Sequence, residues 1–351
     1  MINMADGTDI LKALNEEMDR PYTFMHICGT HEAAIAHAGL RSILPDGLKI
    51  VMGPPGCPVC ITPPQGEIDA AIDLAEKGCI IATYGDLIRV PGTKGSLEEY
   101  GKNDVRVVQG VHKAVEIAEK TDREVVFISV GFETTAPTVA ATILQEPPEN
   151  FSILSCHRFV PPAMKYLLEQ GEAKLDGFLL PGHVCVVAGY EEYEQFPVPQ
   201  VVGGFEPEDI LLGLLMLVKQ VKEGGRAEVE NAYPRAVSRE GNPKAMQMMY
   251  EVFETCDVEW RGGFPVIPGS GLRLKEKYAA YDAQKKFGIE IKHVEKHSAC
   301  ICDRVLRGGV ADPSDCKLFG KACTPRKPVG PCMVSHEGAC KIWALYHQKK
   351  Y

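Results

Sequence analysis

The end of this chain is rich in cysteine and poor in the residues that build a hydrophobic core. Six of the thirteen cysteines lie beyond residue 299, namely Cys300, Cys302, Cys316, Cys323, Cys332 and Cys340. Prolines and glycines recur between them, as in DCKLFGKACTPRKPVGPC, and exclude a long helix there. Metal binding by thiolates can supply the folding free energy that such a segment lacks. The pattern therefore predicts a thiolate-bound metal ion or cluster.

The spacing of these cysteines separates the possible kinds of thiol site. Zinc is usually held by paired C-x2-C knuckles, whereas the spacings from Cys302 through Cys316 and Cys323 to Cys340 are C-x13-C, C-x6-C and C-x16-C. Long, uneven spacings favour a [4Fe–4S] cluster, because separate loops can reach its four corners. Zinc is the alternative. Disulfides rank last, since residues 1–7 lack the basic and apolar segments of a secretion signal, and a cytoplasmic location is expected.

Length and composition narrow the class of protein further. A chain of 351 residues is expected to form two or three domains, and its 24% charged residues are typical of a globular protein. The formal net charge of −9 argues against a nucleic-acid partner. The longest apolar run, residues 210–218, is too short to span a bilayer, so no membrane association is expected.

Short apolar runs alternate with helical patterns through the first two thirds of the chain. Strands are predicted at residues 22–27, 49–52, 79–84, 105–109, 124–130, 151–156, 178–180 and 200–202. Helices are predicted at residues 8–20, 31–43, 67–77, 111–120, 135–144, 162–170 and 211–221, with a helical connector at 234–260 and a turn-rich segment at 262–271. Such alternation predicts an α/β fold with parallel sheets.

The alternating segments form two series about a hundred residues apart. ICGTHEAAIAHAGL corresponds to VGFETTAPTVAATIL, GPPGCPVCITPP to SCHRFVPPAMK, and TYGDLIRVPG to LLPGHVCVVAG. We therefore predict two similar parallel-sheet α/β domains, at residues 20–120 and 121–225, and a small C-terminal iron–sulfur domain. The last domain, residues 226–351, would include the helical connector, and the N-terminal helix 8–19 is a candidate to pack on it.

The first candidate site is the sequence CGTHE at residues 28–32. Cys28 ends a predicted buried strand and precedes a helix, whose N-terminal dipole favours a thiolate. A thiolate is a nucleophile and an iron ligand, and His31 and Glu32 could exchange protons beside it or complete a coordination shell. The alternative is a buried cysteine followed by an ordinary capping turn.

The second candidate site is GCPVC, which contains Cys57 and Cys60. A C-x2-C pair at a helix start can close a disulfide, so a redox dithiol is predicted. The same pair could supply two metal ligands or be structural. The remaining cysteines lie within apolar or helical runs and are interpreted as small core residues: Cys79, Cys156, Cys185 and Cys256.

Two further motifs follow predicted strands of the second series. GFETTAP places Glu133 and Thr134 at a helix start, where they could hold a ligand or simply cap the helix. PGHV places His183 where it could face the same cleft as Cys28, although a lone histidine is often structural. No G-x4-G-K-[ST] sequence is present, so a conventional nucleotide P-loop is not predicted.

Taken with the cysteine framework, CGTHE, GCPVC, GFETTAP, PGHV, LFG-x2-CTP and EGAC resemble, in the same order, the HypD family of [NiFe]-hydrogenase maturation proteins. The resemblance runs through nearly the whole chain. It implies two similar α/β domains and a [4Fe–4S] domain. It also implies a scaffold that carries a transient Fe(CN)2CO iron unit, which is a metallocentre-assembly role with redox activity, not that of a conventional turnover enzyme.

The resemblance further implies partners and residue roles. The partners would be a small HypC-type chaperone, a HypE-type cyanide donor and the hydrogenase large subunit. Cys28 would hold the iron, supported by His31 and Glu32, and Cys57 and Cys60 would form a redox dithiol between that site and the cluster. Glu133, Thr134 and His183 would line the cleft. Thiolate suits low-spin Fe(II), and a cluster with a dithiol can supply electrons.

Three residues depart from the family pattern without removing a candidate ligand: Pro54 in GPPGCPVC, Asp303 after Cys302, and His336 before EGAC. We predict Cys302, Cys316, Cys323 and Cys340 as cluster ligands, with Cys300 and Cys332 in reserve. The alternative function is a cluster-dependent thiol–disulfide oxidoreductase in which the Cys57/Cys60 pair acts on a protein disulfide. A zinc-stabilised ligand-binding protein is a third hypothesis.

Overall fold

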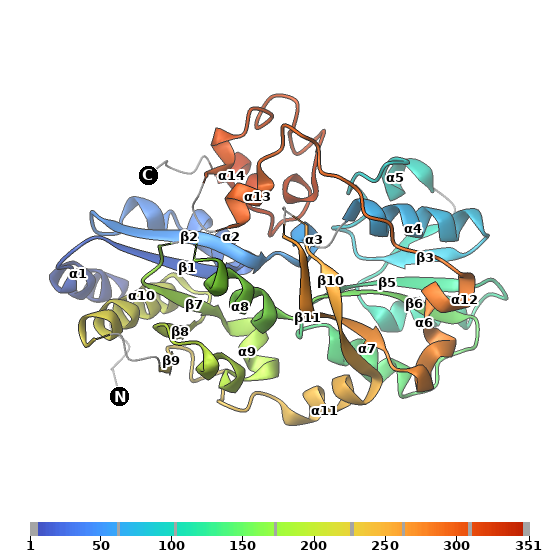
Figure 1. Ribbon diagram of the computed structural model, residues 1–351, viewed down its shortest axis with the longest axis horizontal. Helices are drawn as coiled ribbons and strands as arrows, with labels where there is room; N and C mark the ends of the chain where they lie inside the picture. Colours follow the sequence, from blue (N-terminus) through green and yellow to red (C-terminus); the bar gives the residue numbers. More distant parts are fainter. Residues whose placement is uncertain are drawn as a thin grey trace.

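The computed structural model describes residues 6–61, 64–101, 104–171, 174–224, 228–261, 264–307 and 311–346. It contains two parallel sheets side by side, each covered by helices, and a C-terminal segment that lies over the first sheet (Figure 1). We call the part around the sheet that contains Cys28 the first lobe and the part around the other sheet the second lobe. The predicted α/β class with parallel sheets is confirmed.

The sheet of the first lobe has the order β2-β1-β7-β8-β9, and every neighbouring pair is parallel. Its strands are β1 (Tyr22–Cys28), β2 (Leu48–Gly56), β7 (Gly177–Pro181), β8 (Gln200–Gly203) and β9 (Val229–Asn231). The central strands β1 and β7 are almost wholly buried, which explains why their sequences are continuous apolar runs without alternation.

The sheet of the second lobe has the order β4-β3-β5-β6 and is also parallel. Its strands are β3 (Ile80–Thr83), β4 (Val105–Val107), β5 (Val125–Gly131) and β6 (Phe151–His157). All eight predicted strands are therefore present across the two sheets. The C-terminal ends of β1 and β5 carry the CGTHE and GFETTAP motifs, as expected.

The predicted division at residue 120 does not follow the sheets. The first sheet takes β1 and β2 from before the second sheet and β7, β8 and β9 from after it. The orders β2-β1-β7-β8 and β6-β5-β3-β4 are equivalent, which agrees with the repeat predicted from sequence. The later strands of each half, however, pair in the sheet of the other half. The prediction assumed that successive strands pair within one sheet, whereas the chain crosses between lobes after β2 and after β6.

The helices largely match the predicted ones. Those of the two lobes are α1 (Gly7–Glu17), α2 (Gly29–His37), α3 (Pro58–Ile61), α4 (Pro64–Glu76), α5 (Leu97–Tyr100), α6 (Val111–Ala118), α7 (Ala136–Ile143), α8 (Val160–Gln170), α9 (Gly182–Ala188) and α10 (Pro207–Lys222). Ile10 and Leu14 of α1 are buried in one cluster with apolar residues of α10. The N-terminal helix therefore packs on the first lobe. None of the helices within the described residues is long and apolar enough to cross a membrane.

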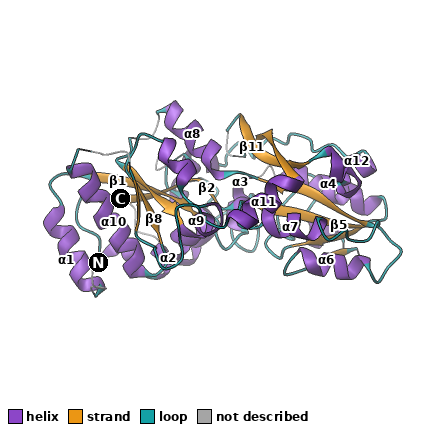
Figure 2. Cartoon of the chain, turned by 90° about the horizontal axis from the view of Figure 1, so that it is seen from below, coloured by secondary structure: helices purple, strands orange, loops and turns teal. Residues whose placement is uncertain are grey.

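Residues 243–274 join the two lobes. Helix α11 (Pro243–Val252) contacts both α9 and α7 and lies between the lobes in Figure 2. It is followed by an antiparallel hairpin, β10 (Phe253–Glu259) and β11 (Val266–Leu274), which packs on β6 and α8. The prediction of a helical connector at 234–260 is thus wrong after Val252, where a strand begins. The strand was not recognised because its buried and exposed residues alternate only weakly, and because the strand it pairs with comes later in the chain.

Within the described part of the C-terminal segment the α-helices are all short, as its prolines and glycines predict. These are α12 (Ala283–Phe287), α13 (Cys302–Leu306) and α14 (Ala339–Tyr346). Helix α14 packs on α2, and α13 packs on β2, so the cysteine-rich segment covers the strand ends that carry CGTHE and GCPVC (Figure 1). One buried apolar cluster runs through both lobes and includes Cys302 and Cys332.

Candidate functional site

Cys28 lies at the carboxyl end of β1, where the chain turns directly into α2. Cys28 is only 8% exposed. Burial raises the pKa of the Cys28 thiol to about 11, although hydrogen bonds from the His31 backbone and from Thr30 lower it and nearby Glu337 raises it further. The helix terminus therefore does not make a thiolate by itself, contrary to the sequence-based expectation, because the desolvation penalty is larger. A coordinated metal ion would deprotonate such a thiol.

His31 is held as a neutral imidazole. Its Nε2–H donates to the carbonyl oxygen of Gly204 at 2.8 Å, because a carbonyl can only accept. Burial and the neighbouring His26 lower the pKa of His31 to about 3. The Nδ1 atom is buried and has no partner within the described residues, so its lone pair is available to a metal or to a proton donor.

Phe205 links this histidine to the PGHV motif. Its ring stacks on His31 with a centroid separation of 4.6 Å and on His183 with a separation of 3.8 Å. His183 is exposed, and partial burial lowers its pKa. The structure therefore links His183 to His31 of the CGTHE motif through an aromatic ring that no sequence motif indicated.

Glu32 has a different role from the one predicted. Its Oε2 accepts hydrogen bonds from Arg41 and His26, both at 2.7 Å, and its Oε1 accepts one from Trp343 Nε1 at 3.3 Å. Although burial opposes it, the charge of Arg41 and the bond from His26 hold the pKa of Glu32 well below its usual range. A carboxylate with all these partners is a structural anchor between α2 and α14 and a poor proton carrier.

Cys57 and Cys60 are fully buried beneath the C-terminal segment. The Cys60 N–H donates to the Cys57 carbonyl oxygen at 3.0 Å within the single turn of α3. The Cys57 thiol donates to Ser335 Oγ at 3.3 Å. Burial raises the pKa of Cys60, and hydrogen bonds with Cys332 and Cys57 raise it further. The hydrogen bond with Cys60 lowers the pKa of Cys332. The GCPVC dithiol is thus in contact with the C-terminal thiols.

The C-terminal thiols interact with one another to different degrees. Cys323 interacts electrostatically with Cys300 and Cys316. Cys340 interacts most strongly with Cys332, and then with Cys300, Cys323 and Cys316. The strongest interactions of Cys302 are with Cys300, Arg261 and Cys332. A hydrogen bond from Cys302 lowers the pKa of Cys300 to about 6 despite burial.

The fit of these thiols to a metal centre can be tested on their surroundings. No group of three or more His, Cys, Asp or Glu side chains within the described residues is placed to hold a metal ion. However, the thiols converge from separate loops, and the buried guanidinium of Arg261 beside them has two nitrogen atoms, Nε and Nη1, without partners in the described chain. A cation left without hydrogen-bond acceptors fits an anionic occupant such as a thiolate-bound cluster.

In the second lobe, Glu133 lies at the end of β5 near the start of α8. Its Oε1 accepts from the Val160 backbone N–H at 3.0 Å, and its Oε2 is buried without a partner in the described residues. Burial raises the pKa of Glu133 to about 8, although the Val160 N–H lowers it. Thr134 is half-buried, and no ligand role is indicated by its contacts.

Two residues that the sequence did not indicate connect Glu133 with Cys28. Cys185 and Tyr193 are both buried, and each interacts electrostatically with Glu133 and with Cys28. Tyr193 Oη is buried without a partner in the described residues. Residues 182–195 therefore bring the CGTHE and GFETTAP motifs into one region, and Cys185 is a core residue, as predicted. A buried tyrosine hydroxyl leaves no signal in a single sequence.

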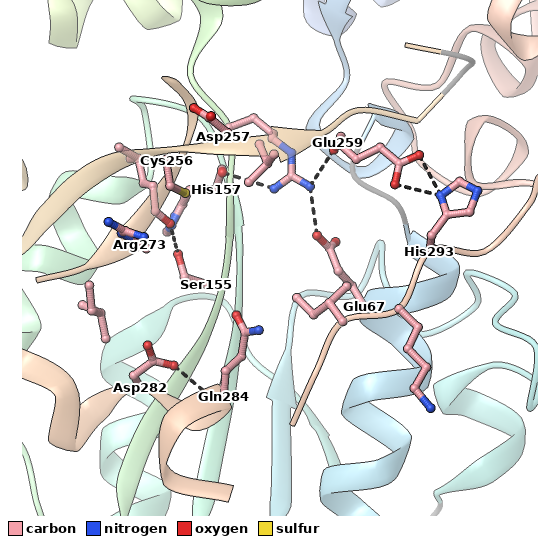
Figure 3. Close-up of a pocket in the computed structure, with 16 residues that line it drawn as sticks. Glu67, Ser155, His157, Cys256, Asp257, Glu259, Arg273, Asp282, Gln284 and His293 are labelled. Atoms are coloured by element: carbon pink, nitrogen blue, oxygen red, sulfur yellow. Dashed lines mark hydrogen bonds and ion pairs between the residues drawn. The ribbon is translucent and has the colours of Figure 1, made fainter. Parts of the chain in front are cut away.

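A separate cavity of about 270 Å³ lies in the second lobe between β6 and the β10–β11 hairpin (Figure 3). None of the predicted site residues lines it. Its charged side chains pair with one another: Arg158 Nη2 contacts Glu67 Oε1 at 3.2 Å, and His293 Nδ1 contacts Glu259 at 2.7 Å. Acidic and basic groups are mixed around the cavity, so its lining does not favour one class of ligand.

Comparison with known proteins gives a consistent result. The sequence profile of the family described as "HypD: Hydrogenase formation hypA family" matches residues 6–347. A putative hydrogenase expression/formation protein of Methanocaldococcus jannaschii is 46% identical over 99% of this chain and 100% of its own length. The hydrogenase maturation factor HypD of Cupriavidus necator is 44% identical over 94% of this chain and 90% of its own length. The hydrogenase maturation factor HypD of Rhizobium leguminosarum is 46% identical over 93% of this chain and 88% of its own length.

Proposed function

The chain belongs to the HypD family of hydrogenase formation proteins, and we propose that it is a scaffold on which the Fe(CN)2CO unit of a [NiFe] site is assembled. The iron unit is cargo that is passed on to the hydrogenase large subunit. A HypC-type small chaperone would share it, and a HypE-type protein would donate cyanide. This role follows the family membership and the chemistry of the residues around Cys28.

The observation that carries the proposal is the contact of the cysteine-rich segment with both motifs of the first lobe. Thr30 Oγ1 donates to Glu337 Oε1 at 2.7 Å, and Cys57 contacts Ser335. A single C-terminal loop therefore touches the turn after the candidate iron ligand and one thiol of the candidate dithiol. Electron transfer between a cluster and a site under assembly needs this kind of proximity.

Cys28 is the candidate iron ligand because a thiolate is a soft donor that suits low-spin Fe(II) with cyanide and CO. Binding of iron would displace the thiol proton. His31 has too low a pKa to keep that proton at neutral pH, but its free Nδ1 lone pair can accept a hydrogen bond or coordinate. Glu133, whose pKa is raised to about 8, is better suited to take up or release a proton in this region.

A [4Fe–4S] cluster bound by the C-terminal thiols would supply single electrons. We propose Cys300, Cys316, Cys323 and Cys340 as its ligands, and so replace Cys302 with Cys300. Both Cys323 and Cys340 interact with Cys300 and Cys316, and neither has Cys302 among its main partners, which supports the exchange. Cys302 and Cys332 then join Cys57 and Cys60 as redox thiols, and closing one disulfide among them releases two electrons and two protons.

The alternative function, a thiol–disulfide oxidoreductase acting on a protein disulfide, is less well supported. Such an enzyme needs a thiol that a substrate disulfide can reach. Cys57 and Cys60 are both 0% exposed and are covered by the segment that carries Ser335. Reduction of a protein disulfide would therefore require that segment to move away.

The test is anaerobic purification of the chain with and without a HypC-type chaperone, followed by iron and sulfide analysis and infrared spectroscopy. We expect cyanide and CO stretching bands in the wild-type complex and their loss in Cys28→Ala. The matched control is Cys79→Ala, another buried cysteine, which should keep the bands. Absence of the bands from the wild-type complex, with disulfide turnover that is indifferent to Cys28→Ala, would favour the oxidoreductase. Stoichiometric zinc would exclude the cluster.

A further inference from the structure

Arg261 carries a buried positive charge that no carboxylate balances within the described residues. It follows the buried Trp260 just after β10 and is 6% exposed. A guanidinium stays protonated in proteins, so the charge cannot be lost on burial. Its Nε and Nη1 atoms make no hydrogen bond to the described part of the chain. Burial of such a group is costly unless a negative charge lies beside it.

The groups beside Arg261 are the cysteines of the C-terminal segment. Its charge lies close enough to Cys300, Cys302 and Cys332 to interact with each of them. Cys300 is one of the proposed cluster ligands, whereas Cys302 and Cys332 are proposed redox thiols. The guanidinium therefore lies where the two sets meet.

The chain is shaped to accept this side chain. A Cβ atom on Gly330 would lie 2.8 Å from Arg261 Nη2, closer than real Cβ contacts allow. The lack of a side chain at Gly330 lets the loop that leads to Cys332 approach the guanidinium. Arg261 thus comes from the chain just after β10, while the thiols that it faces come from the C-terminal segment.

We propose that Arg261 is a positioning residue that raises the reduction potential of the thiol-bound cluster by offsetting its negative charge. The proposal rests on the cluster assigned above. A cluster with four thiolate ligands gains one negative charge when it accepts one electron, so a fixed nearby cation stabilises the reduced form more than the oxidised form. Net charge and hydrogen bonds to sulfur are established determinants of such potentials. The guanidinium of Arg261 can provide both the positive charge and, through its free N–H groups, hydrogen bonds to sulfur.

The test is a redox titration of the full-length chain with dithionite under argon, followed by electron paramagnetic resonance of the reduced cluster. Arg261→Met removes the charge and keeps an apolar stem, and we expect at least a tenfold shift toward the oxidised form, or 59 mV for a one-electron couple. Arg261→Lys should show less than half that shift. The matched control is Arg326→Met, which removes an exposed arginine of the cysteine-rich segment and should leave the potential unchanged.

An Arg261→Met potential equal to that of wild type would overturn the inference. If Arg261→Met fails to hold a cluster, Arg261→Gln decides, since it keeps N–H donors but lacks the charge. Cluster loss in both neutral variants but not in Arg261→Lys would support the electrostatic role, and loss in all three would refute it. A wild-type chain without iron and sulfide would instead refute the proposed cluster, so the two failures are distinguishable.

Discussion

The backbone of Glu337 packs directly on Gly29, the residue after Cys28. A Cβ atom on Gly29 would lie 2.5 Å from Glu337 Cβ and 2.7 Å from the Glu337 carbonyl oxygen. The glycine of CGTHE and the glutamate of EGAC are therefore adjacent because one of them has no side chain. This contact places the cysteine-rich segment over the candidate iron ligand.

Gly29→Ala is expected to lower the free energy of unfolding by about 1–3 kcal/mol, the usual cost of overpacking. The added methyl group must displace the Glu337 backbone, which cannot rotate away as a flexible side chain could. Urea denaturation measures the change. Gly85→Ala is the control, because its Cβ would meet its nearest neighbour, Val107 Cγ1, at an ordinary 3.6 Å. Equal stability of the two variants would contradict the packing argument.

Glu32→Gln is expected to cost about 3–5 kcal/mol of stability, as for other buried ion pairs that lose one partner. The change removes the Glu32 carboxylate charge from beside the buried Arg41 guanidinium, and the Glu32 side chain is only 1% exposed. Chemical denaturation with circular dichroism gives the difference. Glu98→Gln, which removes an ion-paired carboxylate that is 57% exposed, should change stability by less than about 1 kcal/mol. A Glu32→Gln effect as small as this would rule out the anchoring role.

The raised pKa of Glu133 predicts a pH dependence of stability. Between its ordinary pKa of 4.5 and about 8, the folded state binds more protons at Glu133 than the unfolded state. The Glu133 contribution to stability is therefore full below pH 4.5 and is lost as pH rises through 8. From pH 6.5 to pH 8 the loss amounts to about 2 kcal/mol.

Unfolding free energies of wild type and Glu133→Gln, compared at pH 6.5 and pH 8, test this expectation. The glutamine keeps an oxygen for the Val160 N–H but does not titrate, so the variant should lose less stability over this interval. Burial lowers the pKa values of His31 and His157 to about 3. Their contribution to stability therefore increases with pH up to about 6.5 and is constant above it, so it does not affect this interval. Parallel pH profiles in wild type and variant would show that Glu133 titrates normally.

The revised ligand set predicts opposite results for two cysteines that are separated by one residue. Cys300→Ala should lose the cluster, because Cys300 interacts with Cys323 and Cys340. Cys302→Ala should keep it, because its strongest partners are Cys300, Arg261 and Cys332. Iron and sulfide content after anaerobic purification distinguishes the two. The reverse pattern would restore Cys302 to the ligand set, and Cys256→Ala, a half-buried cysteine on β10, is the control.

The strands and the positions of the motifs could be predicted because they depend on local patterns. An apolar run such as residues 125–130 indicates burial on both faces, and a Gly/Thr/acid turn after it marks the start of a helix. The partner of a strand is a non-local choice. Nothing in the run at 177–181 says that it pairs with β1 and not with β6, which immediately precedes it in the chain.

The candidate site shows the same limit. Cys28, Cys57, Cys60 and Glu133 are recognisable because each follows a strand in an unusual motif. Arg261, Tyr193 and Phe205 carry no motif, and their importance comes from burial without a partner or from stacking between two histidines. Glu32 lies within a motif, yet its contacts with Arg41 and Trp343 give it an anchoring role.

By itself, the sequence determined the α/β class, the repeated motifs at strand ends, and a C-terminal segment with only short helices and many thiols, because these features follow from residue type and spacing. Only the tertiary structure decided which strands share a sheet, which thiols face one another and which buried charge faces them. Those relations depend on burial and on contacts between residues far apart in the chain, such as Glu32 and Trp343, and no local pattern records them.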